Sequence, residues 1–231
     1  WSGAAWAHRP DGLSTGGYVI GIAPEDILEG KRTPVGWISH RSGKLQRVAR
    51  SSLAAEVQAL TVAEDELFMV RMMWAELNGF VSDVVSGTAS AGRELKPMIK
   101  GVRDVRSCLC VDAKSIYDCL AKQVQMQSLA EKRTALELMA FERCIEETGL
   151  IVRWCHSEAN LSDSLTKASA YGPIELYMRT GCWVLVHDEE QLSAKKRKER
   201  GLTRFETNKK DFAGLLREAF KNADIALPVN G

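Results

Sequence analysis

Long apolar runs, paired cysteines and a strong excess of charge of either sign are all missing from this chain of 231 residues. No stretch approaches the roughly 20 apolar residues that cross a bilayer, and no basic segment precedes an apolar one near Trp1. The net charge of +1 argues against a globally basic nucleic-acid binder. We therefore expect no membrane span and an intracellular location, cytoplasmic or nuclear.

The cysteines stand singly within apolar or helical stretches, and none belongs to a CxxC pair of the kind that binds zinc. The six are Cys108, Cys110, Cys119, Cys144, Cys155 and Cys182. We expect buried free thiols in a reducing compartment. The chain starts without a methionine, which suggests a piece of a longer protein.

With 45% hydrophobic residues, the chain has enough apolar side chains for one complete core. Turn signals and apolar periodicity predict strands at 16–22, 34–40, 107–111 and 150–155, and helices at 51–77, 114–122, 129–148 and 158–168. This order predicts an α/β fold with a mixed central sheet flanked by helices. We assign residues 1–171 to this domain. Residues 172–231 are assigned to a charged, partly helical C-terminal extension, with one candidate strand at 183–186.

Three acidic residues lie at positions where core-facing residues are expected. Glu56 starts an apolar helical stripe, Asp112 ends an apolar run, and Asp163 opens a short predicted helix. Carboxylates that point inward together repel each other and lose hydration, so they persist mainly where a cation neutralises them. The three residues therefore predict a divalent-metal site. Each also has a local alternative: a favourable charge in a first helical turn, a helix cap, or an exposed helical acid, respectively.

The motifs around these residues resemble, in the same order, those of the ribonuclease H domain of copia-type (LTR) retrotransposon polyproteins. They are residues 51–60 (SSLAAEVQAL), 111–115 (VDAKS) and 161–167 (LSDSLTK). Residues 4–7 and 17–19 are similar to the first hairpin of that family, so the resemblance covers about residues 1–170.

The resemblance implies a ribonuclease H-like fold with a mixed sheet of about five strands. It implies endonucleolytic hydrolysis of the RNA strand of RNA–DNA hybrids by two-metal-ion catalysis. Glu56, Asp112 and Asp163 would be the catalytic residues and the ligands of Mg²⁺, with Mn²⁺ as the other candidate metal. The partners implied are the RNA–DNA hybrid and the reverse transcriptase portion of the same polyprotein.

The first strand departs from the family pattern. Where the family has Ser-Asp-Ala-x-Trp-Ala, residues 2–7 read SGAAWA, so Gly3 stands in place of a fourth carboxylate on a strand that is cut short. Asp11 follows Pro10, which disfavours a central strand and favours a turn. We expect metal affinity and turnover to be reduced. The alternative is a catalytically degenerate domain with a nucleic-acid-binding or structural role only.

A basic segment precedes the first long helix. Residues 31–50 contain six Lys and Arg residues and no acidic residue. Arg41, Lys44, Arg47 and Arg50, together with Lys114 beside Asp112, are the candidate contacts to hybrid phosphates. An ordinary solvated edge strand is the alternative interpretation. His156 is interpreted as a loop histidine without a catalytic role.

Overall fold

The computed structural model describes residues 1–79, 95–121, 129, 131–155, 159–167 and 170–185. Its central sheet has the strand order β4-β2-β1-β5-β6. These strands are β1 (Ser2–Ala5), β2 (Thr15–Ile22), β4 (Gly36–Lys44), β5 (Cys108–Val111) and β6 (Ile151–Trp154). Strand β1 pairs antiparallel with β2 and parallel with β5, so the sheet is mixed. The predicted α/β fold with a five-stranded mixed sheet is confirmed.

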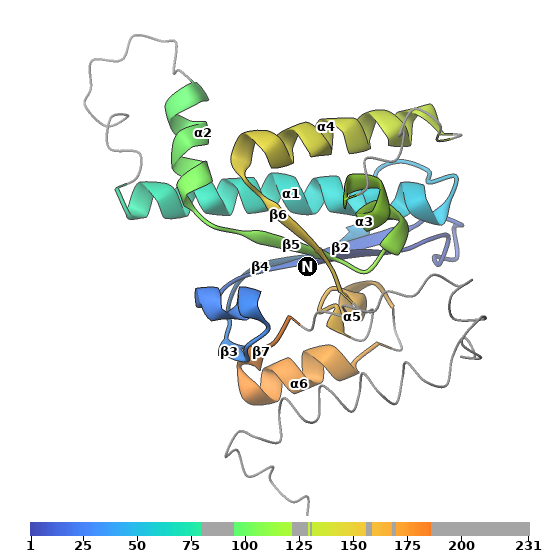
Figure 1. Ribbon diagram of the computed structural model, residues 1–231. Coiled ribbons are helices and arrows are strands. Elements are labelled where there is room, and N and C mark those ends of the chain that lie inside the picture. Colours follow the sequence, from blue (N-terminus) through green and yellow to red (C-terminus); the bar gives the residue numbers. More distant parts are fainter. Residues whose placement is uncertain (80–94, 122–128, 130, 156–158, 168–169, 186–231) are drawn as a thin grey trace, which may run out of the picture.

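Helices cover both faces of this sheet, with α1 and α4 on one side and α5 and α6 on the other (Figure 1). The helices are η1 (Glu25–Glu29), α1 (Ser52–Leu77), α2 (Leu95–Asp104), α3 (Lys114–Ala121), α4 (Lys132–Thr148), α5 (Asp163–Thr166) and α6 (Gly172–Thr180). A separate two-stranded sheet joins β3 (Thr33–Pro34) to β7 (Cys182–Trp183). Among the described residues, no helix is long and apolar enough to cross a membrane.

The long helix α1 follows from its local sequence. The Ser51 hydroxyl accepts a hydrogen bond from the Ala54 amide at 3.1 Å, which is the expected N-cap contact. The helix ends at Leu77, where Asn78 takes the C-cap position and Gly79 follows with a positive φ of 72°. The helix predicted over 51–77 is confirmed, including the capping role of Ser51.

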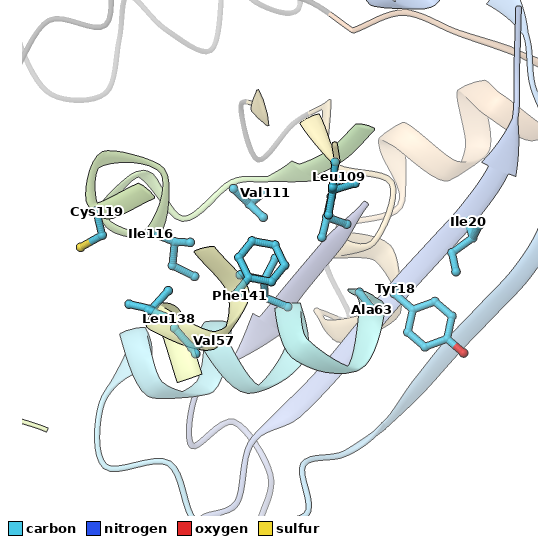
Figure 2. Packing of buried hydrophobic residues seen from close by; sticks show 12 residues of the cluster. Tyr18, Ile20, Val57, Ala63, Leu109, Val111, Ile116, Cys119, Leu138 and Phe141 are labelled. Carbon is cyan, nitrogen blue, oxygen red and sulfur yellow. The ribbon is translucent and has the colours of Figure 1, made fainter. Parts of the chain in front are cut away.

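Two large apolar cores form on opposite faces of the sheet because side chains alternate along the strands, and a third, smaller cluster includes Ala55 and Leu45. Tyr18 and Ile20 of β2 point to one face, where they join the cluster around Leu60 and Leu138 (Figure 2). Val19, between them, joins the opposite cluster around Trp183. This division gives each sheet face its own buried layer. All six cysteines are free, as expected, but only Cys110, Cys119 and Cys155 are buried, and the other three are half-buried.

A buried arginine fastens α1 to its neighbours. Arg71 is 3% exposed, and its guanidinium donates to three backbone carbonyls. The acceptors are Val102 O at 2.8 Å, Val105 O at 3.2 Å and Thr148 O at 2.7 Å. These carbonyls belong to α2, to the residue shortly after it, and to the end of α4. Arg71 thus holds the C-terminal half of α1 against both helices.

The structure differs from the sequence-based expectations near the C-terminal end of the core. The helix predicted over 158–168 is wrong in extent, because α5 has four residues in the described part of that range. The Asn160 side chain accepts from the amide and the hydroxyl of Ser162 at 3.2 and 2.7 Å, a local arrangement that competes with helix. The strand predicted over 34–40 is shifted, since β4 begins at Gly36 and continues to Lys44.

Residues beyond 171 contribute to the second core. Helix α6 was not predicted, and its Tyr177 is 8% exposed and donates to Val35 O at 2.8 Å. Trp183 in β7 is fully buried. The division of the chain at residue 171 stays a prediction, and residues 186–231 lie outside the described part.

Candidate functional site

The site lies beside the central strand β1, at Gly3. A Cβ atom added there would lie 3.0 Å from Ser162 Oγ, 3.2 Å from Asn160 Nδ2 and 3.4 Å from Asp163 Oδ1. Asn160 Nδ2 also donates to Ser2 O at 2.9 Å, which ties this loop to β1. A side chain at position 3 would therefore contact Ser162 and Asn160 and lie close to Asp163.

Asp163 opens α5, as predicted, and its side chain is only 5% exposed. Lys167, one helical turn later, places its ammonium 2.9 Å from both Asp163 Oδ1 and Asp163 Oδ2. Burial lowers the pKa of Lys167, but the hydrogen bonds and charge of Asp163 more than offset this, so the pKa is raised. The lysine is therefore a firmly charged partner of this aspartate.

Asp112 follows β5 directly and is the second carboxylate of the site. Its side chain is 9% exposed, and its Oδ2 lies 3.8 Å from the Lys167 ammonium. Burial, and next the charge of Asp163, raise the pKa of Asp112 to about 6. Its Oδ1 is buried and has no hydrogen-bond partner among the described residues. A buried carboxylate oxygen without a partner is costly, so this atom is available to a ligand.

Glu56 lies in the first turns of α1 and completes the set. Burial is the main cause that raises its pKa to about 8, and the charges of Asp112 and Asp163 add to the rise. The ammonium of Lys167 and the backbone amide of Ala4 oppose it. Because the three carboxylates influence one another, they share one electrostatic environment. The structure brings Asp112 and Asp163 to one lysine and places Glu56 within the influence of both charges, although the three residues are far apart in the sequence.

The donor chemistry of the site suits a hard divalent cation. Carboxylate oxygens are the ligands that Mg²⁺ and Mn²⁺ take, and the free Asp112 Oδ1 offers one. Within the described residues, however, no group of three or more His, Cys, Asp or Glu side chains is arranged to hold a metal ion. Lys167 occupies both oxygens of Asp163 instead. The residue types fit a metal, while their arrangement is that of an internal ion pair.

The candidate phosphate contacts lie in different settings. Arg41 and Arg50 are exposed, and Lys44 is exposed but pairs with Asp11 at 3.6 Å. Arg47 pairs with Glu137 of α4, and Lys114 is half-buried. Strand β4 is an edge strand of the sheet. The hydroxyl of its Ser42 donates to Leu165 O of α5, so β4 lies beside the element that carries Asp163. The basic strand and the acidic site therefore adjoin.

The structure also tests the interpretation of Asp11 and shows buried residues that the sequence analysis did not single out. Asp11 accepts from the Leu13 amide at 3.1 Å in the connection between β1 and β2, which confirms its turn role. His156 lies outside the described residues. Sequence reasoning assigned no role to Lys167, although its spacing of four residues from Asp163 on a predicted helix was a usable signal. It also missed Asn160 and Ser162, both fully buried.

Comparison with known proteins adds no identification, because no family model, curated protein or solved structure matches this chain.

Proposed function

We propose that residues 1–171 are a retroelement ribonuclease H-type domain that hydrolyses the RNA strand of RNA–DNA hybrids. The observation that carries the proposal is that Asp112 and Asp163, from two separate motifs, lie at the same Lys167 ammonium, and that Glu56, from a third motif, is near enough for their charges to raise its pKa. The sheet order is consistent with a ribonuclease H-like fold, since β1 has an antiparallel neighbour on one side and a parallel one on the other.

The three carboxylates would hold Mg²⁺ or Mn²⁺. When bound, such ions supply an activated water and stabilise the leaving 3′ oxygen. Asp112 is the best-placed ligand, because its Oδ1 already lacks a partner within the described structure. The raised pKa values of Glu56 and Asp112 mean that ion binding near neutral pH would release protons.

The exposed basic residues of β4 are suited to the substrate. Ser42 of this edge strand contacts α5, and Lys44 lies on the same face as Ser42, so a hybrid held there by its phosphates would lie next to the acidic site. Arg41 pairs with Tyr18 and lies on the opposite face of the same strand. Contacts of this kind follow backbone geometry and 2′-hydroxyls, and they do not depend on base sequence. The remainder of the proposed polyprotein, including its reverse transcriptase, would deliver the hybrid.

A second candidate function is hybrid binding without cleavage. It is favoured by Gly3, which contributes no ligand where an added Cβ would lie 3.4 Å from Asp163 Oδ1, and by the Lys167 ammonium that binds Asp163. The two candidates share the binding surface on β4 and differ in whether the acidic residues support chemistry.

The discriminating experiment is cleavage of an RNA-labelled hybrid by the full chain and by Gly3→Asp, in Mg²⁺ and in Mn²⁺. The nearest neighbours of an added Cβ are the fully buried side chains of Ser162 at 3.0 Å and Asn160 at 3.2 Å, which must move by a few tenths of an ångström to admit it. We expect Gly3→Asp to cleave at least about tenfold faster than the natural chain. Gly3→Ala is the matched control, because it adds the Cβ without the carboxylate. Glu56→Gln in the Gly3→Asp background should abolish cleavage.

If neither the natural chain nor Gly3→Asp cuts, while both bind the hybrid, the second candidate function replaces the first. Binding is measured separately, with Arg41→Ala/Lys44→Ala as the test variant and the exposed Arg143→Ala on α4 as its control. The double variant should bind more weakly, and its salt slope should fall by about one for each phosphate that the protein no longer neutralises. Unchanged binding in the double variant would reject the β4 surface for both candidates.

A further inference from the structure

The acidic site contains its own cation. Among the carboxylates, Asp163 receives two hydrogen bonds from the Lys167 ammonium, each at 2.9 Å, and Asp112 lies 3.8 Å from the same nitrogen. The lysine stands at the end of α5, where its amide donates to Asp163 O at 2.9 Å. Its backbone is therefore fixed to the residue that its side chain binds.

The two oxygens that Lys167 takes are those that Asp163 would offer to a metal ion. An ammonium and a divalent cation repel each other strongly at such separations, and each needs the same lone pairs. Both cannot be seated on Asp163 at once. In the described structure the ammonium occupies both oxygens of Asp163.

The Lys167 side chain is also suited to moving away from Asp163. Its side chain is 37% exposed, whereas those of Asp163 and Asp112 are 5% and 9% exposed. A lysine side chain has a flexible four-carbon stem and a compact charge that water solvates well. The Lys167 side chain is therefore partly open to solvent, while the two carboxylate side chains are buried.

We propose that Lys167 is an internal counter-cation that neutralises the acidic cluster in the metal-free protein and is displaced from Asp163 when a divalent cation binds. The inference rests on the proposed metal-binding function. Lys167 would compete with the metal ion for the oxygens of Asp163. Lys167 acts through Asp163 and is a positioning residue, without a place among the reacting groups.

The test is Mn²⁺ binding by isothermal titration calorimetry to the full chain and to Lys167→Met, which keeps the length of the side chain and removes its charge. We expect Lys167→Met to bind Mn²⁺ about tenfold or more tightly. Its metal-free form should unfold at lower temperature than the natural chain, and Mn²⁺ should restore more of its stability. Lys100→Met, at an exposed position of α2, should match the natural chain in both measurements.

Equal or weaker Mn²⁺ binding by Lys167→Met overturns the inference, and so does the absence of Mn²⁺ binding to both proteins. Tighter binding by Lys167→Met without hybrid cleavage by any variant would support the inference and reject the proposed nuclease function. The two failures are therefore distinguishable.

A second measurement uses the natural chain and does not depend on a folded neutral variant. The side-chain resonances of Lys167 are followed by nuclear magnetic resonance during a Mg²⁺ titration and are assigned with Lys167→Arg. We expect them to change at the Mg²⁺ concentrations that saturate the site, as the ammonium moves from the carboxylates into water. Resonances that stay constant through saturation would overturn the displacement.

Discussion

Replacing Glu56 by Gln should make the metal-free protein more stable at alkaline pH. Burial and the charge of Asp112 raise the pKa of Glu56 to about 8 in the folded protein, whereas the value in an unfolded chain is 4.5. Between these values the folded state holds a proton that the unfolded state has lost. Below pH 4.5, Glu56 is protonated in both states and does not lower the free energy of unfolding. As the pH rises from 4.5 towards 8, the free energy of unfolding therefore falls. Glutamine does not ionise and is not subject to this loss.

The size of the effect follows from the two pKa values. At 1.36 kcal/mol per pKa unit, the gap between about 8 and 4.5 corresponds to roughly 5 kcal/mol. The ionisations of Glu56 and Asp112 influence each other, so part of this gap belongs to the pair and not to Glu56 alone. We therefore expect Glu56→Gln to exceed the natural chain by about 2 to 4 kcal/mol at pH 8.5, and by little at pH 4.5.

Urea unfolding at the two pH values, in the presence of a chelator, measures this difference. Glu76→Gln is the matched control, because Glu76 is an exposed glutamate of the same helix, and it should follow the natural chain at both pH values. Saturating Mg²⁺ should narrow the gap, since a bound cation stabilises the ionised carboxylate. A Glu56→Gln protein that is no more stable than the natural chain at pH 8.5 would refute the reasoning that the carboxylate is buried among like charges.

Two further predictions concern how α1 is held. Arg71→Met should cost about 3 kcal/mol in urea unfolding, because buried carbonyls of α2 and α4 lose their donor, while Arg143→Met on the surface of α4 should stay within about 0.5 kcal/mol of the natural chain. A destabilisation at Arg71 no larger than that at Arg143 would contradict the three-carbonyl network. Ser51→Ala should cost about 1 kcal/mol through removal of the N-cap, and Ser52→Ala, one position further, should cost less. Equal destabilisation at the two serines would show that the cap hydrogen bond contributes nothing specific.

The local sequence was sufficient for much of the architecture. A serine cap and an Asn-Gly stop bounded α1 to within one residue, and Gly149 marked the end of α4. Short apolar runs predicted both ends of β2, β5 and β6 to within one residue. These signals act through capping and side-chain alternation over a few residues, so they are legible without the rest of the chain.

The sequence was less able to predict contacts between segments that are distant along the chain. The helix predicted over 158–168 is interrupted because Asn160 bonds to Ser162 and to β1, a contact made across 158 positions of sequence. Arg71 falls on the helix between apolar residues and would be expected to reach solvent. Its burial depends on carbonyls brought in by α2 and α4.

By itself, the sequence determined which residues of the acidic motifs have carboxyl groups, and it identified Glu56, Asp112 and Asp163 as one candidate set. Only the tertiary structure decided that an ammonium lies among them and that Gly3 faces Asp163. The physical reason is that partners across a mixed sheet are set by strand order and register, here the pairing of Ser2 with Val111. The local sequence shows which kinds of group a side chain can bind, and the fold decides which groups lie beside it.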